Sequence, residues 1–232
     1  MNKQDHNIIP MKLGMTNCYL IRGGKDFVMV DAGPPKALGK FQQQLEQLGI
    51  NPSTIKQIFV THMHFDHMGS LPEISQLTGA KSAMHHLDKE LVEKGTIIMP
   101  GGIGPWGKLL TAFLWTIKPM VNKNIGPVPV DLCLDDSPYS LDEFQINGKI
   151  IHTPGHTAGS ISLVLQSGEA FVGDLAMSGF PRVSGPGPFV LGDDLETMKG
   201  SWQLLLDEGA RRIFPSHGKP FDAAVFKKYL NP

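Results

Sequence analysis

The sequence predicts an α+β fold in which two β-sheets pack face to face and helices cover their outer faces. Three observations support this. Both halves of the chain combine strand-like apolar runs with runs of helical periodicity. Glycines follow two of the predicted helices, where helices commonly end. The composition, 41% hydrophobic and 19% charged, is that of a globular chain able to bury a sizeable core. We expect one domain spanning residues 1–232.

The first half begins with a predicted hairpin, because a polar, glycine-containing turn separates two apolar runs. Helical spacing of leucine and phenylalanine then predicts a helix that Gly49 closes, and a second helix ends at Gly79. A short apolar run between these helices predicts a buried strand. The predicted elements are strands Asn17–Ile21, Phe27–Val30 and Ile58–Val60, and helices at 38–48 and 71–77.

The second half repeats this mixture of strands and helices. Short apolar runs predict strands at Lys149–His152, Ile161–Leu165, Ala170–Val172 and Arg212–Phe214. Helical spacing predicts a helix at Leu195–Leu206 and a final helix at about Phe221–Tyr229.

Two segments do not fit this scheme of strands and helices. Thr96–Pro129 combines glycine, proline and large apolar residues, and we interpret it as an inserted helical lid or a subunit interface. Ser178–Gly192 is rich in glycine and proline, which disfavour a continuous helix or strand. We expect it to form a loop at the mouth of a site.

Charge and cysteine content exclude several classes of protein. Lysine plus arginine number 21 against 22 acidic residues. The chain therefore lacks the excess of basic residues that would indicate a nucleic-acid partner. The only cysteines, Cys18 and Cys133, are too few for a disulfide framework and suit a reducing compartment. Residues 1–10 lack the apolar run of a secretory signal or a membrane span. We therefore expect a cytoplasmic protein with no membrane span.

The segment Thr61–His67 places four potential metal ligands within six residues. Alternation along an extended chain puts His62 and His64 on the same side, where they can share one ion. If the backbone turns into a helix at about Asp66, then Asp66 and His67 point toward a second ion nearby. Clustered histidine and aspartate are a recognised metal signature, so the spacing favours a pair of metals.

Three further candidates stand just after predicted strands: His156, Asp174 and His217. Strands that end together deliver these side chains to a common edge of the sheets. Imidazoles with carboxylates suit two divalent ions, with Zn(II) the first choice and Fe or Mn the alternatives. We interpret His6 and His152 as surface or core residues. His85 and His86 follow a predicted strand and could face the site from its rim, but we assign neither to the metals.

The HxHxDH run at His62–His67, with VDAG at Asp31, TPGHT at His156, GD at Asp174 and PSHG at His217, resembles the metallo-β-lactamase superfamily. The resemblance covers most of the chain and keeps the family's order. It implies a four-layer αββα sandwich of two mixed β-sheets flanked by helices, with the metals at one edge. By that resemblance, the first ion is held by His62, His64 and His156, the second by Asp66, His67 and His217, and Asp174 bridges them. Histidine rather than glutamate at position 64 counts against the flavodiiron branch.

The resemblance implies a metal-dependent hydrolase in which a hydroxide bridging the two ions cleaves an ester, lactone, thioester or related bond. Asp66 would also act catalytically, by orienting this hydroxide and moving its proton. One alternative is a mononuclear iron dioxygenase of the sulfur-oxidising type, which resembles the same superfamily. The other is a metal-binding or regulatory protein without catalysis.

Residues adjacent to the cluster in sequence, Asp31, Thr61 and Thr157, are candidate partners of the ligands, although capping of turns and strand ends explains them equally well. In the lid segment, apolar residues could line a pocket for a small-molecule substrate with an apolar part. The same residues could form a homodimer interface. They are Trp106, Leu109, Leu110, Phe113, Leu114 and Trp115.

Overall fold

The computed structural model describes residues 8–95, 101–122, 127–179 and 186–230. The first half of the chain forms a mixed six-stranded sheet in the spatial order β1-β2-β3-β4-β5-β6. Its first three strands are antiparallel, and its last four run parallel to one another. The strands are β1 Ile8–Leu13, β2 Thr16–Gly23, β3 Asp26–Val30, β4 Ile55–Phe59, β5 Lys81–His85 and β6 Leu132–Leu134.

The second half forms another six-stranded sheet, in the order β12-β11-β10-β9-β8-β7. Its neighbours are antiparallel except for the parallel pair β10 and β11. The strands are β7 Tyr139–Ser140, β8 Gly148–His152, β9 Ile161–Leu165, β10 Glu169–Phe171, β11 Arg212–Phe214 and β12 Phe221–Asp222. Each predicted strand is present, with ends shifted by a few residues at most.

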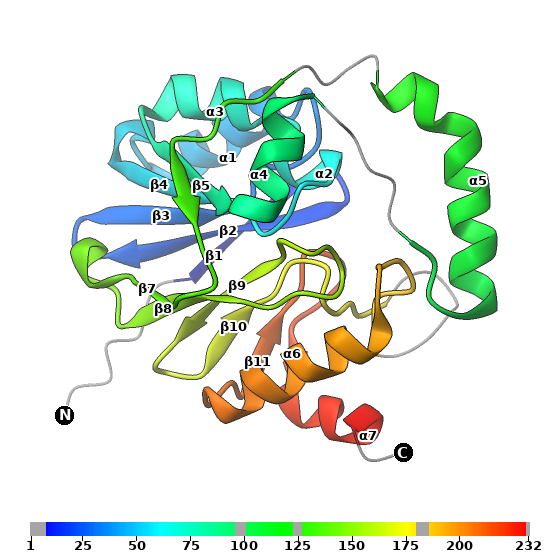
Figure 1. Cartoon of the computed structure of the whole chain (residues 1–232). Helices are drawn as coiled ribbons and strands as arrows, with labels where there is room; N and C mark the ends of the chain where they lie inside the picture. Colours follow the sequence, from blue (N-terminus) through cyan, green and yellow to red (C-terminus); the bar gives the residue numbers. More distant parts are fainter. Residues whose placement is uncertain (1–7, 96–100, 123–126, 180–185, 231–232) are drawn as a thin grey trace.

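Helices cover the outer faces of both sheets, so the predicted four layers are present (Figure 1). Against the first sheet lie α1 Leu38–Leu48, α3 Leu71–Thr78 and α4 His86–Glu93, together with the short α2 Phe65–Met68. Against the second lie α6 Leu195–Asp207 and α7 Lys227–Leu230. The 3-10 helices are η1 Pro52–Thr54, η2 Asp142–Phe144 and η3 Ala223–Phe226.

The core has three apolar layers that match this architecture. One cluster, which includes Leu13, Phe41 and Ile74, lies between the first sheet and its helices. A second, which includes Tyr19 and Phe171, fills the space between the sheets. The third packs α6 through Trp202 against the second sheet. Burial of apolar area at about 25 cal/mol per Å² makes these layers the main stabilising term of the fold.

The lid segment contains a helix, α5 Gly104–Asn122, which stands to one side of the sandwich (Figure 1). Residues 96–100 and 123–126, and the side chains of Trp106 and Leu114, lie outside the described part of the chain. Leu110 packs against the core of the second sheet, whereas Leu109 and Phe113 are 62% and 61% exposed. The prediction of a helix here is confirmed. No helix of the described residues is long and apolar enough to span a membrane.

The prediction of one continuous final helix at 221–229 is wrong. Phe221 and Asp222 pair with β11 as the edge strand β12. Asp222 then accepts a hydrogen bond from the amide of Ala224 and caps the 3-10 turn that follows. Pairing with a neighbouring strand thus overrides the local helical pattern for these two residues.

Candidate metal centre

The four residues of the HxHxDH run lie between β4 and the start of α3. His62 and His64 are on the loop that follows β4, and His64 is the N-cap of α2. Asp66 and His67 lie within α2, which begins one residue before the position predicted from the sequence. The change from loop to helix therefore separates the run into two pairs, as expected.

The second sheet supplies the other three residues. His156 follows β8, Asp174 follows β10 and His217 follows β11. Gly173 allows the close approach of the two sheets here. It has a φ of 55°, and an added Cβ would lie 2.6 Å from Oγ1 of Thr61. The structure thus brings all seven predicted site residues together at one edge of the sandwich.

A first group is formed by His62, His64 and His156. Nε2 of His156 lies 3.1 Å from Nε2 of His62 and 2.9 Å from Nδ1 of His64. Two nitrogens that bind one tetrahedral ion at about 2.0 Å lie roughly 3.3 Å apart. All three imidazoles are buried. Their spacing therefore fits ligands that surround a single ion.

A second group is formed by Asp66, His67 and His217. Oδ2 of Asp66 lies 3.2 Å from Nε2 of His217 and 3.7 Å from Nε2 of His67. Asp174 lies between the two groups: its Oδ2 is 3.5 Å from His67 and 3.8 Å from His156, and its Oδ1 is 3.4 Å from His217. One carboxylate therefore reaches both groups.

Hydrogen bonds at the far side of the rings orient three of these imidazoles. Nδ1 of His156 lies 2.9 Å from the carbonyl oxygen of Leu191, and Nδ1 of His217 lies 3.2 Å from that of Met15. Nδ1 of His67 lies 2.8 Å from Oδ2 of Asp31. Because carbonyl and carboxylate oxygens only accept, each Nδ1 carries a proton, and Nε2 is the nitrogen that faces the centre and can bind a metal once it carries no proton.

Asp31 and Thr61, both singled out from the sequence, lie directly behind the ligands. Asp31 is fully buried and accepts hydrogen bonds from the amide and hydroxyl of Thr61 at 2.7–2.9 Å. It also accepts from Ser216. Its φ of 60° is a conformation that aspartate tolerates better than most residues. One carboxylate thus links β3, the His62 loop and the His217 loop.

Asp88, which sequence reasoning missed, links the other pair of loops. Its carboxylate accepts hydrogen bonds from the amide of Met63, the hydroxyl of Thr157 and the amide of Gly159. Burial raises the pKa of Asp88. Thr157, the third predicted neighbour, therefore acts through Asp88 and holds the His156 loop beside the His62 loop. The signal in the sequence that could have pointed to Asp88 is its position as an acidic residue in the first turn of α4.

The electrostatics differ between the two groups. Burial lowers the pKa of His62 and His156, and lowers that of His64 to about 3. These three imidazoles are therefore neutral near pH 7, and the neutral form is the one that binds metal.

In the second group, Asp66, His67 and His217, the carboxylates favour protonated imidazoles. Burial lowers the pKa of His217, but Asp174 and then Asp66 outweigh burial and raise this pKa to about 10. Asp174 and Asp31 likewise raise the pKa of His67 against burial. In return, and again against burial, His217 and His67 lower the pKa of Asp174. Protons here hold the charge that a divalent ion would carry, so metal binding should release protons.

Two buried polar atoms of the centre support the metal interpretation. Nε2 of His67 and Oδ1 of Asp174 have no hydrogen-bond partner among the described residues. Leaving such atoms without a partner costs about 1–3 kcal/mol each. A nitrogen and oxygen donor set of this kind fits divalent zinc, iron or manganese.

The two side chains of the centre that reach the surface most are Asp66 and His217, which are 23% and 13% exposed. Phe189 lies beside them. Its ring stacks on His217 at 5.6 Å and meets His156 edge-on at 5.5 Å. The described part of the 178–192 loop thus borders the site, as predicted. The carbonyl of Val190 in this loop accepts from the amide of Ile103, which ties the loop to the start of α5.

Comparison with known proteins identifies the family of the chain. A family model described as the metallo-β-lactamase superfamily matches residues 11–217. The chain is 31% identical over 231 residues to the probable metallo-hydrolase YflN of Bacillus subtilis, covering 93% of this chain and 85% of YflN. It is 29% identical over 229 residues to the β-lactamase-like protein 2 homolog of Drosophila melanogaster. That match covers 95% of this chain but 65% of the fly protein, and a similar nematode protein is covered to 62%.

Solved structures show the same fold. A metallo-β-lactamase family protein from Thermus thermophilus has a TM-score of 0.68 at 20% identity, covering 96% of this chain and 77% of the other. The B3 metallo-β-lactamase BLEG-1 has a TM-score of 0.69 at 19% identity, covering 97% and 100%.

Proposed function

Because the chain belongs to the metallo-β-lactamase superfamily, we propose that it is a hydrolase that uses two divalent metal ions to cleave an ester, lactone, thioester or related bond. The observation that carries this proposal is the position of Asp174, whose carboxylate lies within 3.8 Å of ligand atoms from both histidine groups. A carboxylate shared in this way suits a pair of ions and is not needed for one.

In this proposal His62, His64 and His156 would hold the first ion, Asp66, His67 and His217 would hold the second, and Asp174 would serve both. Bound ions supply an acidified water and a Lewis acid that stabilises negative charge on the substrate. The chain contributes the orientation of the donors and the exclusion of bulk water by the buried imidazoles and Phe189.

Asp66 is the residue of the centre placed to move a proton. Burial opposes its ionisation, but His67 and His217 lower its pKa to about 2, so it is a carboxylate at neutral pH. It lies at the exposed side of the centre, the side from which we expect substrate to approach. A carboxylate at this position can accept a hydrogen bond from the attacking water and take its proton.

Elemental analysis of protein purified without chelators tests the proposed function. We expect about two zinc, iron or manganese ions per chain, and turnover in a screen of ester, lactone and thioester substrates. A single iron per chain together with oxygen consumption would instead identify a dioxygenase. Absence of bound metal, or two metals with no hydrolysis in the screen, would contradict the hydrolase.

We infer that the substrate is a small molecule with an apolar part that contacts α5, whose residues Leu109, Phe113 and Trp115 are more than half exposed. Trp115→Ala should then raise KM, measured with any substrate found in the screen. Leu48→Ala, an exposed apolar residue on α1, should leave KM unchanged. A change in sedimentation with kinetics unchanged per folded chain would show that α5 is a homodimer interface instead.

A further inference from the structure

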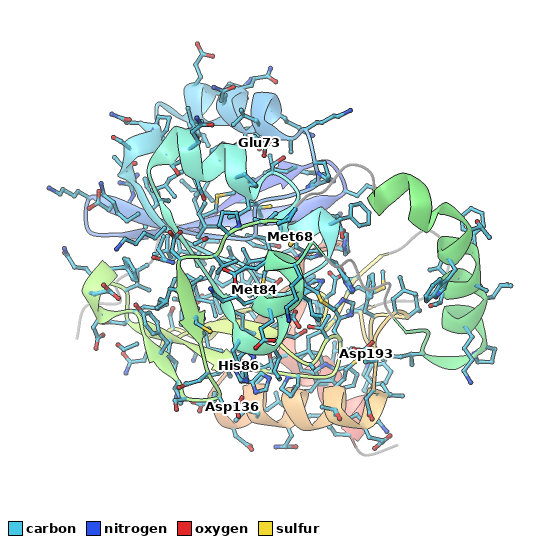
Figure 2. The ribbon with its side chains drawn as sticks, turned by 45° about the horizontal axis from the view of Figure 1, so that its top comes forward. Met68, Glu73, Met84, His86, Asp136 and Asp193 are labelled. Carbon is cyan, nitrogen blue, oxygen red and sulfur yellow. The ribbon has the colours of Figure 1, made fainter. Side chains whose placement is uncertain are left out.

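Three histidines outside the metal centre form a cluster whose contacts are internal. Asp136 lies 3.1 Å from Nε2 of His85 and 2.9 Å from Nδ1 of His152, and the ring of His86 lies 4.4 Å from that of His85. Figure 2 shows His86 and Asp136 next to each other, away from Met68 at the end of α2. The expectation that His85 or His86 faces the metal centre is therefore wrong. None of the buried polar atoms without a partner among the described residues belongs to this cluster, so it offers no ligand site.

A cavity opens at one edge of the sandwich, between the two sheets. It has a volume of about 700 Å³ and is lined by β1 and β2 of the first sheet, β10 and β11 of the second, and the loop after β11. β1 is the edge strand of the first sheet, and β11 lies one strand in from the edge of the second. None of the seven residues of the metal centre is among the described residues that line it. The cavity is therefore a space separate from the metal centre.

Strand register explains why polar side chains meet in this cavity. Lys12 on β1 pairs with Asn17 on β2, so both side chains lie on one face of the first sheet. Tyr19, two residues after Asn17, shares that face, and Arg212 shares a face of β11 with Phe214. Tyr19 and Phe214 both belong to the apolar layer between the sheets. Lys12 and Arg212 are therefore on the inner faces of the two sheets.

The lining of the cavity has an excess of positive charge. Three cations, Lys12, Arg212 and Lys219, line it together with a single carboxylate, that of Glu169. No ion pair of the described residues includes any of these three cations. The inner faces of packed sheets usually carry the apolar side chains of the core. Cations at this position therefore indicate an anionic ligand.

The aromatic part of the lining is held rigidly by the core. The ring of Phe214 lies 4.9 Å from that of Phe171 and 5.7 Å from that of Tyr19. The Tyr19 hydroxyl donates a 2.7 Å hydrogen bond to the carbonyl of Pro215. The guanidinium carbon of Arg212 lies over the Phe214 ring, 5.3 Å from its centre. A guanidinium stacked in this way keeps its N–H groups at its edge, where they can donate in pairs to an oxyanion.

The backbone of the third wall is also fixed, in the loop that carries His217. The side-chain amide of Asn17 donates to the carbonyl of Gly218 at 2.8 Å. The amide of Lys219 donates to Oγ of Ser178 at 2.8 Å, and the Ser178 hydroxyl donates to the carbonyl of Lys219 at 2.6 Å. Lys219 therefore extends from an ordered backbone, so a ligand would lose little affinity to ordering of this loop.

We propose that this cavity binds a phosphate monoester that carries a flat apolar group. Lys12 and Arg212 face the phosphate from opposite sheets and Lys219 faces it from the loop, while Pro10 and Phe214 provide apolar contact. A phosphate monoester carries a charge of about −1.5 to −2 at pH 7, which matches the excess of cations better than a single carboxylate does. The volume of about 700 Å³ suits a small organic ligand. This site does not depend on the hydrolase proposal.

Calorimetric titration with 1-naphthylmethylphosphonate tests the site, because this probe has the dianion and the flat ring but no ester bond to cleave. We expect Lys12→Gln and Arg212→Gln each to weaken binding by about 10- to 100-fold, the effect of losing one hydrogen bond to a charged group. Both side chains are exposed, so both variants should fold. Lys228→Gln removes an exposed charge of α7 outside the cavity and should bind as wild type does. Methylphosphonate, which lacks the ring, should bind wild type more weakly.

Spectra that correlate ¹H with ¹⁵N locate the bound probe in wild type, where it should shift the side-chain amide of Asn17 and the backbone amide of Lys219. A phosphonate can also bind metal ions, and equal affinity in wild type and all variants would place the probe there and overturn the proposal. Absence of binding to wild type would also overturn it, and the cations would then protect an open sheet edge from pairing. Failure of the hydrolase proposal would instead appear in metal content and turnover, which these variants share with wild type.

Discussion

Replacing Asp66 by asparagine is expected to lower kcat by about 10²- to 10⁴-fold, the usual contribution of a positioned acid or base. The amide keeps the shape of the side chain but cannot accept the proton. It also weakens the group formed with His67 and His217, which lie 3.7 and 3.2 Å from Oδ2 of Asp66. Steady-state kinetics with a substrate from the screen, together with metal content per chain, measures both effects.

Thr16→Ala is the matched control for this variant. The Thr16 hydroxyl donates a 3.4 Å hydrogen bond to Oδ2 of Asp66, so the change removes a neighbour of the carboxylate and retains the carboxylate itself. We expect kcat within a few-fold of wild type, because one long hydrogen bond contributes about 1 kcal/mol or less. Full activity of Asp66→Asn at unchanged metal content would show that Asp66 has no part in proton transfer.

Replacing Asp31 by alanine should lower the free energy of unfolding by about 3–5 kcal/mol, the cost of removing one member of a buried charge pair. Nδ1 of His67, the amide of Thr61 and the hydroxyl of Ser216 would each lose an acceptor. His67 would no longer be oriented, so metal affinity should also fall by about 10- to 100-fold. Urea denaturation of the metal-free protein and metal titration separate the two effects.

Ser216→Ala supplies the comparison for Asp31. It removes one 3.1 Å hydrogen bond to the same carboxylate and leaves its contact with His67 unchanged. About 1 kcal/mol of stability should be lost, with metal affinity close to wild type. If Asp31→Ala were no more destabilised than Ser216→Ala, then Asp31 would not organise the centre.

The sequence predicted much of the fold and the candidate centre because both depend on local patterns. The strands follow short apolar runs, and Gly49 and Gly79 end helices as left-handed C-caps. His62 to His67 are adjacent in sequence, and His156, Asp174 and His217 each follow a strand. Ends of strands in packed sheets meet at a shared edge, so their proximity could be inferred without knowing any contact.

The remaining features depend on contacts between distant parts of the chain. His156 donates a hydrogen bond to the backbone carbonyl of Leu191. The sequence could not predict this contact, because every residue has a backbone carbonyl. Asp88 resembles an ordinary acidic residue in the first turn of a helix, yet it contacts Met63 and Thr157. Phe221 reads as part of a helix until the neighbouring strand β11 is present.

The seven site residues are divided between the two sheets, and this division determines how the protein loses activity when its core is damaged. Four of these residues follow strands or lie in helices of the first sheet's half, and three follow strands of the second sheet. The apolar layer around Tyr19 and Phe171 holds the two sheets in their relative positions. Neither half carries a complete donor set, so the centre forms only after the halves have docked. Damage to that inner layer, well away from any donor atom, would therefore appear first as an inactive but still largely folded protein.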